Sequence, residues 1–134
     1  MKKILIYTDG GARGNPGPAG IGVAFVSPTN EIISTYKEYI GEATNNTAEY
    51  KALILALEKI QDFKVDEIEC RLDSELVVKQ LKGEYKVKDQ NLKELFNRVK
   101  ELIFFKQISF IHIKREKNKI ADKLVNEAID EAGF

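Results

Sequence analysis

The chain has 134 residues, of which 43% are hydrophobic and 31% charged, and its 21 basic and 21 acidic side chains give a formal net charge of zero. This composition excludes a disordered chain and predicts one globular domain over residues 1–134. The single cysteine, Cys70, excludes an internal disulfide framework, and no Cys/His group has zinc spacing. Four apolar residues follow Lys3, too few for a signal peptide or a membrane span, so we expect a cytoplasmic protein.

The predicted elements begin with a short apolar strand at residues 4–7, which we expect to be buried on both faces. A Gly- and Pro-rich turn that includes Asp9 ends this strand. Residues 20–26 and 31–40 predict two more strands, and short connections suggest an antiparallel meander. A helix from Asn45 to about Gln61 follows, in which Asn46 and Glu49 have the spacing of a capping box.

The second half of the chain alternates strands and helices. Residues 67–72 predict a fourth strand, residues 74–81 a short helix, and Asp89 the cap of a longer helix. Residues 107–113 predict a fifth strand, and Asn118 caps a terminal helix. The order βββαβααβα predicts an α/β fold with a mixed five-stranded sheet flanked by helices.

The charges are unevenly distributed along the chain. Residues 79–123 contain 13 of the 21 basic residues and 6 of the 21 acidic ones, so the rest of the chain is negative. Such a local excess is typical of a surface that binds a polyanion, but solvated helix faces give the same pattern.

Four acidic residues lie at the ends of predicted elements: Asp9, Glu49, Asp73 and Asp122. Each has an ordinary explanation, as a turn residue, a capping partner, an N-cap or a helix-start acid. However, ligands of open α/β sheets gather at the carboxyl ends of neighbouring strands, where Asp9 and Asp73 are predicted to lie. Carboxylates that meet there repel unless a cation joins them, and oxygen ligands without His or Cys suit Mg²⁺ or Mn²⁺. Two such ions about 4 Å apart are a common device for cutting a phosphodiester.

Four ordered segments resemble the motifs of the type 1 ribonucleases H and together cover nearly the whole chain: 7–22 (YTDGGARGNPGPAGIG), 44–53 (TNNTAEYKAL), 72–77 (LDSELV) and 118–126 (NKIADKLVN). The resemblance implies a ribonuclease H-like fold and an endoribonuclease that cuts the RNA strand of RNA/DNA hybrids, leaving 5′-phosphate and 3′-hydroxyl ends. Asp9, Glu49, Asp73 and Asp122 match the catalytic acids of the family, which hold two Mg²⁺ or Mn²⁺ ions.

The resemblance also implies which residues contact the nucleic acid. Asn15, Asn45 and Asn46 match positions that read the 2′-hydroxyls of the RNA strand together with backbone groups of the first turn. In that turn, Gly11 and Arg13 are also expected to bind the substrate. Thr44 matches a position near the phosphate of the DNA strand. Amide side chains both donate and accept, which suits a 2′-hydroxyl, whereas the alternative for the Asn45–Asn46 pair is helix capping.

The sequence departs from the family pattern in three places. Many members of the family have a Gly- and His-containing loop before the last helix. Here the corresponding residues, 112–118, are few, basic and without glycine, as in the shorter branch of the family. We expect His112 to be structural, which leaves Arg115 as the candidate auxiliary residue. The basic handle is missing, so hybrid binding should depend on scattered lysines and be salt-sensitive. Glu75 replaces an amide that often helps to read RNA, which makes double-stranded RNA a further candidate substrate.

The leading hypothesis is therefore a metal-dependent ribonuclease with no membrane association and no obligate protein partner. One ion, held by Asp9 and Asp122, would activate a water, and the other, held by Asp9, Glu49 and Asp73, would stabilise the leaving 3′ oxygen. Two alternatives remain open: a catalytically weak or inactive nucleic-acid-binding module of the same fold, and an actin-like ATPase, which would need a second domain.

Overall fold

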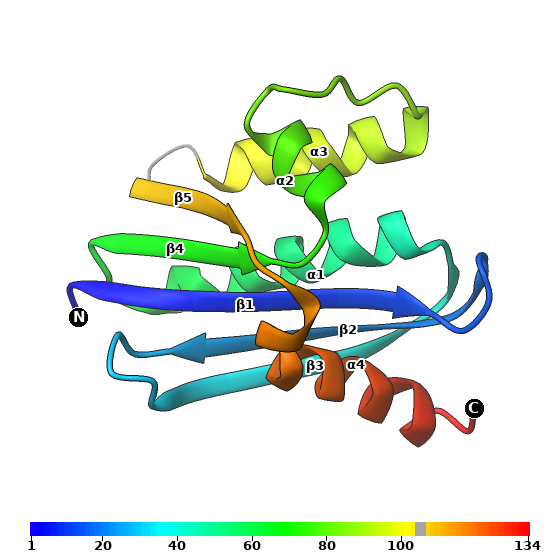
Figure 1. Cartoon of the computed structure of the whole chain (residues 1–134), viewed down its shortest axis with the longest axis horizontal. Coiled ribbons are helices and arrows are strands. Elements are labelled where there is room, and N and C mark those ends of the chain that lie inside the picture. The colour runs from blue at the N-terminus through cyan, green and yellow to red at the C-terminus, as the bar shows by residue number, and fades with distance from the viewer. Residues whose placement is uncertain (104–106) are drawn as a thin grey trace.

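The computed structural model describes residues 1–103 and 107–134, and a five-stranded mixed sheet organises them (Figure 1). The strands are β1 (Lys3–Ala12), β2 (Gly17–Val26), β3 (Ile32–Ala43), β4 (Glu67–Leu72) and β5 (Gln107–His112). Their order across the sheet is β3-β2-β1-β4-β5, in which β1 pairs antiparallel with β2 and parallel with β4. The predicted mixed sheet and the element order βββαβααβα are confirmed.

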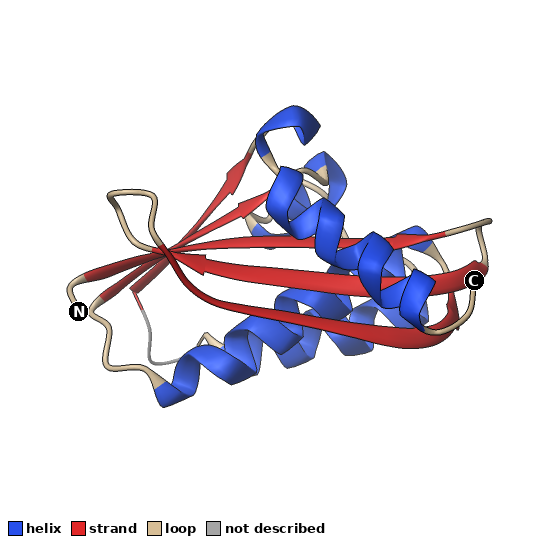
Figure 2. Ribbon diagram, turned by 90° about the horizontal axis from the view of Figure 1, so that it is seen from below, coloured by secondary structure: helices blue, strands red, loops and turns tan. Residues whose placement is uncertain are grey.

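Helices cover both faces of this sheet (Figure 2). They are α1 (Asn45–Lys59), α2 (Glu75–Leu81), α3 (Gln90–Leu102) and α4 (Lys119–Glu131), with single 3₁₀ turns η1 (Ile60–Asp62) and η2 (Arg115–Lys117). α1 packs on β1 and β2, with α3 beside it, and α4 packs on the other face against β2, β1 and β3. Within the described ranges, no helix is long and apolar enough to cross a membrane.

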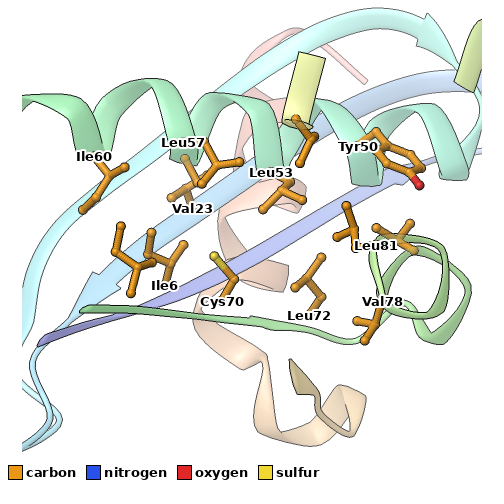
Figure 3. Packing of buried hydrophobic residues seen from close by; sticks show 14 of the residues in the cluster. Ile6, Val23, Tyr50, Leu53, Leu57, Ile60, Cys70, Leu72, Val78 and Leu81 are labelled. Atoms are coloured by element: carbon orange, nitrogen blue, oxygen red, sulfur yellow. The ribbon is translucent and has the colours of Figure 1, made fainter. Parts of the chain in front are cut away.

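The main core lies between α1 and the central strands (Figure 3). Successive side chains of β1 point to opposite faces, so Ile4 and Ile6 pack in the α1 core and Leu5 packs on the opposite face. All three are buried as predicted, and each such side chain stabilises the fold by about 1.5–3 kcal/mol. Tyr7, the last residue of the predicted run, is only half-buried.

Two glycines of β2 allow α4 to lie close to the sheet. A Cβ at Gly22 would lie 2.5 Å from the main-chain oxygen of Ala121, and one at Gly20 would lie 2.8 Å from that of Val125. Because any side chain would push the helix outward, these contacts set the distance between the sheet and α4. They thereby position Asp122, in the first turn of α4, next to the sheet.

β1 is longer than predicted, and this changes the position of Asp9. The strand continues to Ala12, since Gly10 and Gly11 pair with Ile21 and Gly20 of β2, so a turn at Asp9 is wrong. The parallel pairing with β4, however, ends at Thr8. Asp9 is therefore the first residue of β1 beyond the edge of β4, although it lies inside the strand.

Candidate active site

Asp9 and Asp73 follow a pair of neighbouring residues in parallel strands. Thr8 of β1 is in register with Leu72 of β4, so the next residue of each chain segment is an aspartate at the same edge of the sheet. The alternative role of Asp73, as the N-cap of α2, is filled by Ser74, whose hydroxyl accepts the N–H of Val77 at 3.3 Å. The carboxylate of Asp73 is thus free of a capping role.

Glu49 reaches the same edge from α1. The predicted capping box of Asn46 and Glu49 is wrong, because Thr44 is the N-cap of α1. The Glu49 carboxylate instead accepts the main-chain N–H of Gly10 at 2.5 Å. A Cβ at Gly10 would lie 2.2 Å from the main-chain carbon of Ala48, so only glycine permits this close approach of strand and helix.

Asp9, Glu49 and Asp73 form what we call the carboxylate cluster. Each offers a carboxylate oxygen, and the three atoms lie within 4.8 Å of one another; among the residues with described positions this is the one group of its kind. Asp9 and Glu49 are buried, at 8% and 7% exposure. Burial, against a lowering by the hydrogen bond with Glu49 and with the help of the charges of Asp73 and Asp122, raises the pKa of Asp9 to about 7.

Glu49 experiences the same effect more strongly. Burial and then the charge of Asp9 raise its pKa well above the ordinary value, while the Gly10 N–H opposes the rise. Asp9 and Glu49 therefore resist ionisation on their own. A divalent cation would favour their charged forms, and an all-oxygen donor set without His or Cys fits a hard ion such as Mg²⁺ or Mn²⁺.

Asp122 lies beside the carboxylate cluster but outside its 4.8 Å limit. It lines the same cavity of about 440 Å³ as Asp9, Glu49 and Asp73, and its charge contributes to raising the pKa of Asp9. Arg115 also lines this cavity, with its Nη2 3.8 Å from Asp122 Oδ1. The Arg115 side chain is 83% exposed, so this ion pair is weak.

Four of the predicted substrate residues line the cavity, while Asn15 and Thr44 do not, and two of the six join the first turn to α1. Asn45 Oδ1 accepts the main-chain N–H of Ala12 at 2.9 Å, and Asn15 Oδ1 accepts the main-chain N–H of Asn45 at 2.9 Å. Neither asparagine of the Asn45–Asn46 pair caps α1. Gly11, Asn45 and Asn46 line the cavity, whereas the Thr44 hydroxyl is occupied as the helix cap.

Arg13 also lines the cavity, but its guanidinium is bound within the protein. It forms an ion pair with Asp130 at 2.7 Å and donates to the main-chain oxygen of Phe134 at 2.7 Å and to Asn126 Oδ1 at 3.3 Å. These contacts connect the β1–β2 turn to the C-terminal half of α4. The geometry gives Arg13 a structural role in addition to its place at the cavity.

Two other predicted positions lie in different surroundings from those expected. His112 is the last residue of β5, but its side chain is exposed and not packed in the core. Glu75 is 60% exposed in its side chain and forms an ion pair with Lys79 at 2.8 Å, which lowers the pKa of Glu75.

The sequence did not predict the role of Asn118. It precedes α4 as expected, but its side chain makes no cap hydrogen bond. It is 1% exposed, and its Nδ2 donates to the main-chain oxygen of Thr8 and to Oδ2 of Asp73, both at 2.8 Å. The one sequence feature that could have indicated this role is that Asn118 lies four residues before Asp122, in the segment 118–126.

Comparisons with known proteins agree with this arrangement. A family model described as "Reverse transcriptase-like" matches residues 7–128. Ribonuclease HI of Halobacterium salinarum is 47% identical over 131 residues, which are 97% of this chain and 66% of that protein. Ribonuclease H of Clostridium botulinum is 32% identical over 148 aligned positions that cover 98% of both chains.

A solved structure, LC11-RNase H1 in complex with an RNA/DNA hybrid, has a TM-score of 0.92 and 53% identity, and the match covers 96% of this chain and 98% of that one. Some relatives are longer: the chain spans about two thirds of the Halobacterium protein and 36% of a bifunctional protein of Mycobacterium tuberculosis.

Proposed function

Because the chain belongs to the type 1 ribonuclease H family, we propose that it is an endoribonuclease that hydrolyses the RNA strand of RNA/DNA hybrids. The observation that carries this proposal is the carboxylate cluster, in which three acids from β1, α1 and the end of β4 meet in one open cavity. The relative that was solved with an RNA/DNA hybrid supports the choice of substrate.

Two divalent ions, Mg²⁺ or Mn²⁺, are proposed to bind here. Asp9, Glu49 and Asp73 would hold one ion, and Asp9 with Asp122 would hold the other. When bound, two such ions supply an activated water and stabilise the leaving 3′ oxygen, so the products would carry 5′-phosphate and 3′-hydroxyl ends. The protein's own contribution is to bring four carboxylates from separate segments together at one edge of the sheet, with Asp9 and Glu49 buried.

Asn45 and Asn46, which line the cavity, and Asn15, which is bonded to Asn45, would select RNA over DNA. The Oδ1 atoms of Asn15 and Asn45 accept main-chain N–H groups, so their Nδ2 groups are the atoms that remain for the substrate. An N–H donor can bind a ribose 2′-oxygen, and deoxyribose has no such atom. Asn46 would add a further contact, while Thr44 and Arg13 would contribute less because the protein already uses their polar groups.

A cleavage assay with three labelled substrates tests the proposal: an RNA/DNA hybrid, an RNA duplex and a DNA duplex, each with Mg²⁺ and with Mn²⁺. We expect the RNA strand of the hybrid to be cut, largely independently of sequence, and the DNA duplex to stay intact. Cutting of the RNA duplex would extend the substrate range.

The matched variants of this assay are Asp9→Asn and Asp66→Asn, which remove the same charge from a buried cluster position and from an exposed position. We expect Asp9→Asn to cut at least about 100-fold more slowly and Asp66→Asn to cut like the wild type. Hybrid binding without cleavage by the wild type under every metal condition would replace this proposal with a non-catalytic binding module.

A further inference from the structure

Asn118 contacts three of the elements that build the site. Its Nδ2 donates to the main-chain oxygen of Thr8, the residue before Asp9, and to Oδ2 of Asp73, both at 2.8 Å. Its main-chain oxygen accepts the N–H of Asp122 at 3.1 Å. One residue therefore connects β1, the end of β4 and the first turn of α4, each of which carries an acid of the site.

The Asn118 side chain is arranged for these donated bonds and not for capping. An N-cap asparagine normally accepts an N–H of the first helical turn with its side-chain oxygen, and this one does not. Its Oδ1 is instead buried and has no hydrogen-bond partner among the described residues. An unpaired buried acceptor is unfavourable, so the two donated bonds are the feature that this side chain preserves.

The amide cannot be reversed to satisfy its oxygen. In the reversed orientation, Oδ1 would face two other acceptors, the carbonyl oxygen of Thr8 and the carboxylate of Asp73, and neither hydrogen bond would have a donor. The orientation of Asn118 is therefore fixed by its neighbours, and the orientation of Asp73 is in turn fixed by Asn118.

We propose that Asn118 is a positioning residue that holds Asp73 ready for a divalent ion. Its bond to Oδ2 restricts rotation of the Asp73 carboxylate, which keeps this carboxylate in one orientation within the cluster. Its simultaneous bond to Thr8 keeps the ends of β1 and β4 together, and with them Asp9 and Asp73. Partners that orient a ligand in this way strengthen metal binding without touching the metal; the inference rests on the proposed function for the role of the ion.

The affinity for Mn²⁺ in the absence of nucleic acid, measured by titration calorimetry, tests this role independently of activity. We expect Asn118→Ala to bind Mn²⁺ at least about tenfold more weakly than the wild type. In the cleavage assay, kcat should fall by a similar factor while the KM for the hybrid changes less than about threefold, because Asn118 is 1% exposed and its amide donates only within the protein. Mn²⁺ affinity and kcat equal to those of the wild type in a folded Asn118→Ala protein would overturn the inference.

Asn118→Asp is the second variant, in case the cavity left by alanine unfolds the protein. It has the same shape but neither N–H donor, so kcat should fall by about tenfold or more despite the added carboxylate; wild-type kcat would overturn the inference. Gln80→Glu is the matched control, since Gln80 is also a buried amide and its oxygen accepts the Tyr50 hydroxyl, a bond that glutamate keeps. This control should cut and bind Mn²⁺ like the wild type.

A double-mutant cycle shows whether Asn118 acts through Asp73. On an Asp73→Ala background, which removes the acceptor of the Asn118 amide, and with Mn²⁺ raised to keep binding measurable, Asn118→Ala should cause little further loss. An equal loss on both backgrounds would refute the coupling. The two proposals fail separately. Absence of hybrid cleavage by the wild type would reject the proposed function, while weaker Mn²⁺ binding by Asn118→Ala would still support the role of Asn118.

Discussion

Neutralising Asp9 should stabilise the metal-free protein, and the gain should grow with pH. Burial, together with the nearby acids, raises the pKa of Asp9 from an ordinary 3.8 to about 7. The folded protein therefore keeps a proton that the unfolded chain releases, so the free energy of unfolding falls as pH rises from about 4 to about 7. Each pKa unit corresponds to about 1.4 kcal/mol, so ionisable Asp9 should cost the folded state about 4 kcal/mol at pH 8.

Asp9→Asn keeps the neutral shape at every pH and removes this cost. In urea unfolding with EDTA, the variant should exceed the wild type by about 4 kcal/mol at pH 8 and by less than about 2 kcal/mol at pH 5. The exposed control Asp66→Asn should stay within about 0.5 kcal/mol of the wild type. Saturating Mg²⁺ should narrow the difference at pH 8, because an ion bound by the folded wild type stabilises it. A difference that does not change with pH, or a less stable Asp9→Asn, would refute the reasoning.

Three further predictions concern the surroundings of the cluster. Gly10→Ala should lower the free energy of unfolding by about 3 kcal/mol or more, since its Cβ would overlap the main chain of α1. Gly11→Ala is the matched control: its Cβ would meet a side chain at 3.7 Å, so it should lower this free energy by less than about 1 kcal/mol. Urea unfolding checks both. Arg13→Ala should lower the free energy of unfolding by about 1 kcal/mol, a small loss because its ion pair with Asp130 is partly exposed. On an Asp130→Ala background, where the ion pair is already gone, the loss should be smaller, and equal losses on both backgrounds would contradict the contact. Arg115→Ala should slow hybrid cleavage less than about tenfold, given its exposed guanidinium, and a loss as large as that of Asp9→Asn would make Arg115 essential.

The order of the elements could be predicted because hydrophobic periodicity carries most of that information. Periodicity predicts the strand at residues 67–72 and the longer helix that follows Asp89, and the structure confirms both. Asp89 caps α3 as expected, accepting the N–H groups of Asn91 and Leu92. The predicted end of β1 lies too early in the chain, because Gly10 and Gly11 are residues typical of turns. Pairing with β2 is a long-range contact, and it extends the strand past them.

Capping roles could not be assigned from sequence, because Thr44, Asn45 and Asn46 all suit an N-cap. Thr44 is the N-cap in the structure. The side-chain oxygen of Asn45 instead accepts the N–H of Ala12, which lies more than thirty residues away in the sequence. Asn118 is the same case: a residue expected to cap its own helix instead binds Thr8 and Asp73. Local propensity identifies which residues can cap, whereas distant unpaired groups decide which of them do. The division of the chain into one domain stays a prediction.

The central claim is that acids from separate segments jointly hold divalent ions, and anomalous diffraction from crystals soaked in Mn²⁺ tests it most directly. We predict two manganese peaks, one between Asp9, Glu49 and Asp73 and the other between Asp9 and Asp122. The absence of any peak within coordinating distance of Asp9, in crystals where Mn²⁺ binds elsewhere, would contradict it.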